Sequence, residues 1–304
     1  MMEVFHSGER AVHDLLSVQK FADSVGTMIQ PTISKQFESF LNQQTVLMIG
    51  SMDSTGRVWS SFLAGDPGII QVIGPDIVRI NGRINEFDPL FSNIQHNKEV
   101  GILIIDFVSR IRIRINGVIL RYSLDRQFEV KTEQVYGNCP KFIQARKFTY
   151  NPAKENVNKV SYHRDVLNKN QQDWIRNSDT FIIASSSSEG KMDISHKGGM
   201  PGFVHTISED LLLFPDYPGN MLFNTLGNIV QNPNVGLLFF DFDTGDTLQL
   251  TGEAQIIWKI NENIVSKFPG AQRLIQIQVA EVLQTNTSKS YQWEFMKYSP
   301  FNPK

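Results

Sequence analysis

Hydrophobic residues along most of the chain come in short runs separated by turn residues. The turns include DSTG, GDPG and NG sequences, and the runs are rich in β-branched and aromatic side chains. Such spacing predicts the strands of an antiparallel meander. Six of these runs lie in the first half, at 45–51, 57–63, 69–73, 77–81, 99–107 and 111–121.

Helical periodicity interrupts this pattern at a few places. Residues 88–97 and 221–232 carry apolar side chains at i, i+3 and i+4, which predicts one short helix in each half of the chain. Amphipathic patterns predict further helices at about 8–24, 33–42 and 165–177. A polar stretch at 149–165 is expected to be a linker, and the run at 273–283 is expected to be a closing strand.

One predicted strand, at 111–115, alternates isoleucine strictly with arginine. Because side chains alternate across a strand, the isoleucines share one face, and Arg110, Arg112 and Arg114 share the other. This basic face either binds a phosphate or a partner subunit, or is an exposed strand face.

The two halves of the chain resemble each other. Residues 45–73 align with 180–207 if one position is skipped in the turn, and the match continues through Gly101/Gly236 and Gly117/Gly252. A repeat spacing of about 135 residues indicates a duplicated domain and not a repeat array. The chain is therefore predicted to be mainly β, with two β-barrels and peripheral helices. The expected divisions are a helical extension at 1–44, a first copy at 45–148, a linker and helix at 149–179, and a second copy with a C-terminal tail at 180–304.

Composition excludes several classes of protein. The 304 residues are 41% hydrophobic and carry a formal charge of −2, which excludes disorder and makes a nucleic-acid partner unexpected. The apolar runs are shorter than a membrane-spanning helix requires, so no membrane partner is expected either. With one cysteine and no recognisable signal peptide, the chain is expected to be cytoplasmic.

The segment DISHKGGMPGFV, at 193–204, is the first candidate for chemistry. Hydroxyl, imidazole and ammonium donors precede two glycines, a composition that suits a phosphate. The tight turn FPDYPGN at 214–220 could cover a flat ring, and Asn224, Thr225 and Asn228 could flank the following helix. The alternative is that the glycines form hairpin turns and the polar side chains are solvated.

The segment YGNCPKFIQAR, at 136–146, is the second candidate, predicted as a short helix after the first copy. Cys139 is either a thiol activated by that helix and Lys141, or an inert thiol. Metal-binding, nucleotide-binding and nucleophile-elbow motifs are missing, so no metal site is expected and no catalytic residue is assigned.

These segments, together with FHSGERAVHD near the start and LGNIVQNPNVGLLFFDF, resemble the FMN-binding split β-barrel family typified by pyridoxamine 5′-phosphate oxidase, in its two-copy form. The resemblance implies a tandem duplicated split β-barrel that binds FMN through basic and hydroxyl side chains on adjoining strands. It also implies a homodimer, or a pseudo-dimer formed by the two copies. The residues expected to bind the cofactor are Ser195, His196, Lys197, Gly198, Asp216, Asn220, Asn228, Asn138, Lys141 and Arg146.

The chain departs from the family at two places. The R-x-H motif of the true oxidase has no counterpart near the C-terminus, so oxidation of vitamin B6 is not expected. The characteristic arginine of the first FMN strand is replaced by Ser195 or His196. The first copy has Phe62 where the second has His196, so one flavin site per chain is expected, mainly on the second copy.

The resemblance leaves three functions open. The first is an oxidoreductase that passes hydride between NAD(P)H and a small-molecule substrate through FMN. The second is a non-catalytic module that binds a flavin, a deazaflavin or haem. The third is a structural partner of a reductase.

Overall fold

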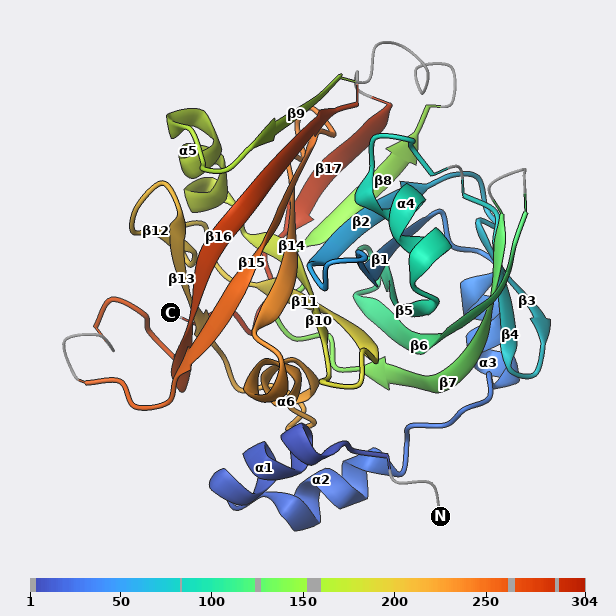
Figure 1. Cartoon of the computed structure of the whole chain (residues 1–304), viewed down its shortest axis with the longest axis horizontal. Helices are drawn as coiled ribbons and strands as arrows, with labels where there is room; N and C mark the ends of the chain where they lie inside the picture. Colours follow the sequence, from blue (N-terminus) through green and yellow to red (C-terminus); the bar gives the residue numbers. More distant parts are fainter. Residues whose placement is uncertain are drawn as a thin grey trace.

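The structure is a computed structural model that describes residues 4–82, 84–123, 127–151, 160–261, 266–287 and 290–303. Most of the described strands belong to two large antiparallel sheets (Figure 1). A separate ribbon pairs β8 (Ala145–Tyr150) with β17 (Tyr291–Lys297).

The first sheet has seven strands, in the order β2-β1-β5-β6-β7-β4-β3. Its strands are β1 (Val46–Met52), β2 (Val58–Ala64), β3 (Ile70–Gly74), β4 (Ile77–Ile80), β5 (Glu99–Asp106), β6 (Ile111–Tyr122) and β7 (Phe128–Asn138).

The second sheet has eight strands, in the order β11-β10-β14-β15-β16-β13-β12, and β9 (Val160–Arg164) pairs with β16 in addition. The other strands are β10 (Thr180–Ser186), β11 (Met192–Gly198), β12 (His205–Thr206), β13 (Leu211–Asp216), β14 (Asn234–Phe240), β15 (Thr247–Ile257) and β16 (Arg273–Asn286).

The two strand orders are identical when β1 is equated with β10 and each later strand with its counterpart. The helices α4 (Pro89–His96) and α6 (Asn224–Gln231) occupy the same place in the two copies. In the described part of the chain, the terminal strands of each sheet do not pair with each other, so each sheet stays open. The structure therefore confirms a mainly β, duplicated split-barrel fold. The exact boundaries of the two domains stay a prediction.

Each sheet encloses its own hydrophobic core. Ile49, Ile102 and Ile113 lie in the first core, and Phe181 and Leu237 lie in the second, all at most 1% exposed. In the first copy the Asp88 side chain caps α4, and Pro89 occupies its first turn, where no backbone donor is needed. The alternating patterns of the sequence thus become the inward faces of curved sheets.

The sheets pack against each other where strands cross without large side chains. Gly101 of β5 lies against the backbone of Asp193 in β11, and Gly236 of β14 lies against Trp59 in β2. A Cβ atom placed on Gly236 would lie 2.6 Å from Trp59 Cα, so only glycine permits this approach. Gly101/Gly236 and Trp59/Asp193 are each aligned pairs of the sequence repeat. The packing contact therefore occurs twice, related by the duplication.

The remaining elements flank the two sheets. Helix α1 (Ser7–Leu15) packs on α6, α3 (Lys35–Leu41) on β3, and α5 (Lys169–Asn177) on β12. The predicted single helix at 8–24 is wrong, because the backbone turns at Ser17, with φ 55°, and α2 (Gln19–Gly26) follows. Of the predicted linker, residues 152–159 lie outside the described residues, and β9 begins at Val160. The predicted closing strand is confirmed as β16.

The predicted helix in 136–146 is also wrong. Strand β7 continues to Asn138, a turn follows, and β8 begins at Ala145. Pro140 accepts a hydrogen bond from the Ile143 backbone within this turn, and Phe142 has φ 67°. Cys139 consequently does not lie at a helix N-terminus.

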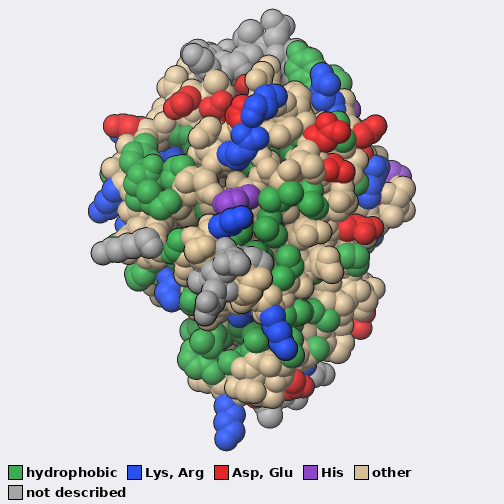
Figure 2. Space-filling view, turned by 90° about the vertical axis from the view of Figure 1, so that its left-hand side faces the viewer, with side chains coloured by type: hydrophobic (Ala, Val, Ile, Leu, Met, Phe, Trp, Pro, Cys, Tyr) green, Lys and Arg blue, Asp and Glu red, His purple; other side chains and the backbone are tan. Residues whose placement is uncertain are grey.

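Charges of both signs are spread over the surface. On the face shown in Figure 2, lysines and arginines are interspersed with aspartates and glutamates, in keeping with the formal charge of −2. No helix in the described ranges is long and apolar enough to cross a membrane.

We expect Gly236→Ala to lower the free energy of unfolding by about 2 kcal/mol, because its methyl group would force the β14 and β2 backbones apart. Urea denaturation measures the change. Gly137→Ala is the matched control, since a Cβ there would meet nothing closer than 3.6 Å. Equal stability of the two variants would contradict the packing argument.

Candidate functional site

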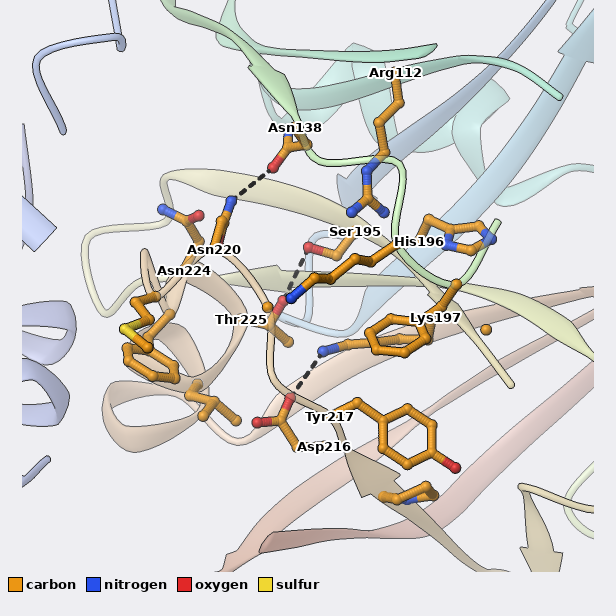
Figure 3. A pocket seen from close by; sticks show the side chains of 18 of the residues that line it. Arg112, Asn138, Ser195, His196, Lys197, Asp216, Tyr217, Asn220, Asn224 and Thr225 are labelled. Carbon is orange, nitrogen blue, oxygen red and sulfur yellow. Dashed lines mark hydrogen bonds and ion pairs between the residues drawn. The ribbon is translucent and has the colours of Figure 1, made fainter. Parts of the chain in front are cut away.

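A cleft lies between the two copies and takes side chains from both. The first copy contributes β6 and the turn after β7, and the second contributes β11, the end of β13 and the start of α6 (Figure 3). The residues that line it and carry polar or charged side chains are Arg112, Arg114, Asn138, Lys141, Ser195, His196, Lys197, Asp216, Tyr217, Asn220, Asn224 and Thr225.

Arg112 brings a positive charge into the cleft. Among the described residues, no carboxylate forms an ion pair with it. Its Nη2 lies 3.7 Å from Cys139 Sγ, and its Nε has no hydrogen-bond partner there. Burial lowers the pKa of this guanidinium to about 10, which still leaves it charged at neutral pH. A buried guanidinium with free donors is suited to an anion, above all a phosphate.

His196 also lines the cleft, close enough to Arg112 to feel its charge (Figure 3). The side chain is 6% exposed, and neither ring nitrogen has a partner among the described residues. Burial lowers the pKa of His196 well below its usual value, and the charges of Arg112 and Lys197 lower it further. The imidazole is therefore neutral, and it offers one donor and one acceptor to a ligand.

Arg114 forms the floor of the cleft through a buried network that joins the copies. Its Nη1 donates to Asp193 Oδ1 at 2.9 Å and its Nη2 to Ser195 Oγ at 2.6 Å. Tyr136 and Asn224 complete the network. Burial alone would lower the pKa of Arg114, but Asp193 and Tyr136 raise it above its ordinary value. The Arg114 guanidinium therefore stays charged, and its hydrogen bonds hold it in place.

The opposite wall of the cleft holds an ion pair and an amide contact. Asp216 Oδ1 lies 3.3 Å from Lys197 Nζ, and Asp216 Oδ2 lies 3.1 Å from Arg273 Nη1. Asn220 Nδ2 donates to Asn138 Oδ1 at 3.0 Å, which ties the turn of the second copy to the end of β7. The cleft as a whole remains positive, because its basic side chains outnumber its carboxylates.

Two aromatic rings stand beside these polar groups. Phe142 comes from the first copy and Tyr217 from the second, and their ring centroids are 5.1 Å apart. Burial raises the pKa of the Tyr217 hydroxyl to about 12, so it stays protonated. Met221 and Phe223 in the same turn have positive φ angles, 61° and 57°. An aromatic wall next to a cationic floor can accept a flat ring that carries a phosphate.

The cleft gathers eight of the ten residues predicted from the sequence to bind a cofactor. These are Ser195, His196, Lys197, Gly198, Asp216, Asn220, Asn138 and Lys141. At Gly198 the missing side chain also makes room for the Phe142 carbonyl oxygen.

The other two predicted residues lie elsewhere. Asn228 donates to Ser185 Oγ at 3.0 Å, away from the cleft. Arg146 pairs with Asp179 at 2.6 Å and stacks on the Phe242 ring, so it is neutralised outside the cleft.

Sequence reasoning did not assign Arg112 and Arg114 to this site. Their alternation with isoleucine marked a polar strand face, and that was the available signal. What could not be seen was that this face of the first copy turns toward β11 of the second. Arg110 on the same stretch points away, and it donates to the backbone carbonyls of Ile143 and Tyr298. In the described residues no group of three or more His, Cys, Asp or Glu could hold a metal ion.

The position related to the cleft by the duplication is filled. Gln249, which aligns with Arg114, donates to Ser60 O at 2.9 Å and lies 3.3 Å from both Ser61 Oγ and Asp88 Oδ2. Phe62, which aligns with His196, packs on an aromatic cluster that the β8–β17 ribbon completes. The members of that cluster are Phe148, Phe240, Tyr291 and Trp293. At this related position, protein side chains occupy the space that stays open in the cleft.

Comparison with known protein families identifies the second copy. The sequence profile of the pyridoxamine 5′-phosphate oxidase family matches residues 167–286. The second copy is therefore similar in sequence to the pyridoxamine 5′-phosphate oxidase family, in agreement with the resemblance seen in the sequence. No curated protein sequence matches the chain significantly.

Several solved structures resemble part of the chain. HupZ of Group A Streptococcus is 14% identical, with a TM-score of 0.31 over 37% of this chain and 90% of its own. A putative pyridoxamine 5′-phosphate oxidase from Lactobacillus delbrueckii is 16% identical, with a TM-score of 0.31 and coverages of 39% and 98%. An FAD-binding protein from Mycobacterium smegmatis is 12% identical, with a TM-score of 0.29 and coverages of 40% and 98%.

We expect Asp193→Asn to lower the free energy of unfolding by about 3 kcal/mol, because it leaves the Arg114 guanidinium buried without its counter-charge. Asp173→Asn is the matched control, since its ion pairs with Lys169 and Arg176 lie at the surface, and a much smaller change in stability is expected there. Chemical denaturation of both variants checks the difference. A loss in Asp193→Asn no larger than in the control would refute the structural role of the pair.

Proposed function

We propose that the cleft binds a flavin nucleotide, specifically FMN, and that the chain is an FMN-dependent oxidoreductase. The observation that carries the proposal is the pair formed by Arg112 and His196. Arg112 is half-buried and His196 is buried, and both line the cleft. The Nε of Arg112 and both ring nitrogens of His196 have no hydrogen-bond partner among the described residues. Unsatisfied buried donors are costly unless a ligand completes them, so this pair fits an anionic group such as a phosphate.

Other cleft residues suit the rest of such a ligand. Lys197, Ser195 and Thr225 add an ammonium and two hydroxyls, and Phe142 with Tyr217 offers aromatic surface to a flat ring. In the cleft, Arg112 is the guanidinium that has no carboxylate partner in the described chain. A single such group matches one terminal phosphate, which favours FMN over a dinucleotide. The match of residues 167–286 to the pyridoxamine 5′-phosphate oxidase family supports the same ligand class.

Bound flavin would supply the hydride chemistry, and the protein would bind, orient and shield it. The cleft residues are matched to those tasks. His196 is neutral and can donate or accept a hydrogen bond, Tyr217 stays protonated, and the ion pair of Lys197 and Asp216 holds two cleft walls together. NAD(P)H as reductant and a small molecule as acceptor are the partners that this proposal implies. A module that binds flavin, deazaflavin or haem without turnover is the alternative.

Arg112→Met is expected to weaken FMN binding about 10- to 100-fold, because a charge-assisted contact to phosphate contributes about 1.5–3 kcal/mol. Quenching of flavin fluorescence during titration measures the dissociation constant. Arg110→Met is the matched control, since Arg110 lies two residues away and bonds to backbone carbonyls outside the cleft. Equal affinity of the two variants would show that the phosphate does not lie beside Arg112.

Reduction by nicotinamide distinguishes the oxidoreductase from the binding module. We expect NADH or NADPH to bleach the flavin absorbance, at about 450 nm, of the reconstituted protein under anaerobic conditions, and air to restore it. FMN that binds tightly but keeps its colour with both reductants would favour the non-catalytic module. Failure to bind FMN at all would rule out both.

A further inference from the structure

A second cavity, of about 910 Å³, lies next to the cleft, and we call it the acidic chamber. Its walls come from the N-terminal segment before α1, strands β6 and β7, the β10–β11 hairpin and one side of α6. This volume is in the range of cavities that hold small organic ligands.

The chamber and the cleft share a wall. Asn224 lines both cavities, and the buried pair of Arg114 and Asp193 lies between them. Arg114 faces the cleft, whereas Asp193 lines the chamber. The same ion pair therefore presents a cation to one cavity and a carboxylate to the other.

The lining of the chamber is rich in carboxyl groups. Two of them, Glu99 and Glu133, share an ion pair with Lys191 Nζ, at 2.9 Å each. Asp76 and Glu189 form no ion pair with any residue that the structure describes. The full set of acidic lining residues is Glu9, Asp76, Glu99, Glu133, Glu189 and Asp193, against two lysines, Lys131 and Lys191.

Two buried polar side chains of the chamber wall determine what the chamber could bind. Asn116 is 9% exposed, and its Oδ1 has no partner among the described residues, while its Nδ2 donates to Gln134 and Asp193. Glu9 is 3% exposed, and its carboxyl group accepts from the His6 backbone and the Asn224 side chain. The Asn116 oxygen, an acceptor without a donor, calls for a ligand that donates hydrogen bonds.

The Glu9 carboxyl group also has an unusually high pKa. Burial raises its pKa to about 8, and the Asp193 carboxylate adds to the rise, while Arg114 and the two hydrogen bonds oppose it. The titratable groups that face Glu9 are His6, Arg114, Tyr136 and Asp193. At neutral pH Glu9 is mostly protonated, and a bound cation would favour its ionised form.

We infer that the acidic chamber binds a small organic cation, an ammonium group carried on an apolar body. The carboxyl groups and Asn116 Oδ1 would receive the ammonium hydrogens. Phe5, Ile29 and Met192, which line the same cavity and are each at most 7% exposed, would contact the apolar part. The chamber does not depend on the proposed function of the cleft, because its lining residues other than Asn224 are different.

The test compares three probes of similar shape by isothermal titration calorimetry on the full chain without added flavin. We expect phenethylamine to bind, and 2-phenylethanol and phenylacetate to bind at least about tenfold more weakly, since both lack the positive charge. Phenethylamine affinity should rise between about pH 6 and 8.5 as Glu9 ionises, with proton release detected near pH 7 in buffers of different ionisation enthalpy.

Variants locate the site. Glu9→Gln, which keeps an acceptor for the His6 backbone, should weaken phenethylamine about tenfold and abolish the pH dependence. The double variant Asp76→Asn/Glu189→Gln changes only the half-buried and exposed rim, and should weaken it about threefold. Glu294→Gln on exposed β17 is the control and should change nothing.

Three results would overturn the inference. They are equal binding of the three probes, an affinity unaffected by both Glu9→Gln and the rim variant, and loss of binding in Asp216→Asn, which would move the amine into the cleft. An FMN titration of the same preparation tests the cleft separately. A negative result for amine binding in the chamber therefore does not affect the test of FMN binding in the cleft, and the reverse also holds.

Discussion

The buried ion pair between Arg114 and Asp193 is the interaction on which the rest of the architecture depends. It crosses from one copy of the fold to the other at the point where Gly101 lets the two sheets approach. Such a pair is stable only when its remaining donors and acceptors are satisfied. Ser195, Tyr136, Asn116 and Asn224 bond to the polar atoms of the pair other than Arg114 Nε and Asp193 Oδ2, and they form the floor of the cleft and the wall of the acidic chamber.

Duplication explains why the two sides of the molecule differ. Both copies keep the same strand order and the same glycine contacts, so the packing of the sheets is symmetric. The side chains at the contact are not. Where one side has Arg114 and His196, the other has Gln249 and Phe62, with an aromatic cluster completed by the C-terminal ribbon. One interface has thus been kept open and charged, while its counterpart has become part of a hydrophobic core.

The fold was readable from the sequence because its determinants are local. Period-two runs, turn residues and the aligned glycines of the repeat predicted the strands and the duplication. The errors have local causes as well: Ser17 breaks a helical pattern by adopting a positive φ, and Pro140 lies in a turn and not at a helix start. The residues of the site could be predicted only in part from the sequence, since the site takes residues from both copies. The Ser-His-Lys strand was identifiable by its composition, but Arg112 enters the cleft through packing between sheets. Arg146 has suitable chemistry, yet Asp179 binds it elsewhere.

The most direct test of this account is a crystal structure of the chain grown with FMN. The account predicts one flavin per chain, in the cleft between the copies, with its phosphate in contact with Arg112 and His196 and its ring near Phe142 and Tyr217. Flavin in the acidic chamber, flavin at the position filled by Phe62, or a cleft without flavin at saturating FMN would contradict it.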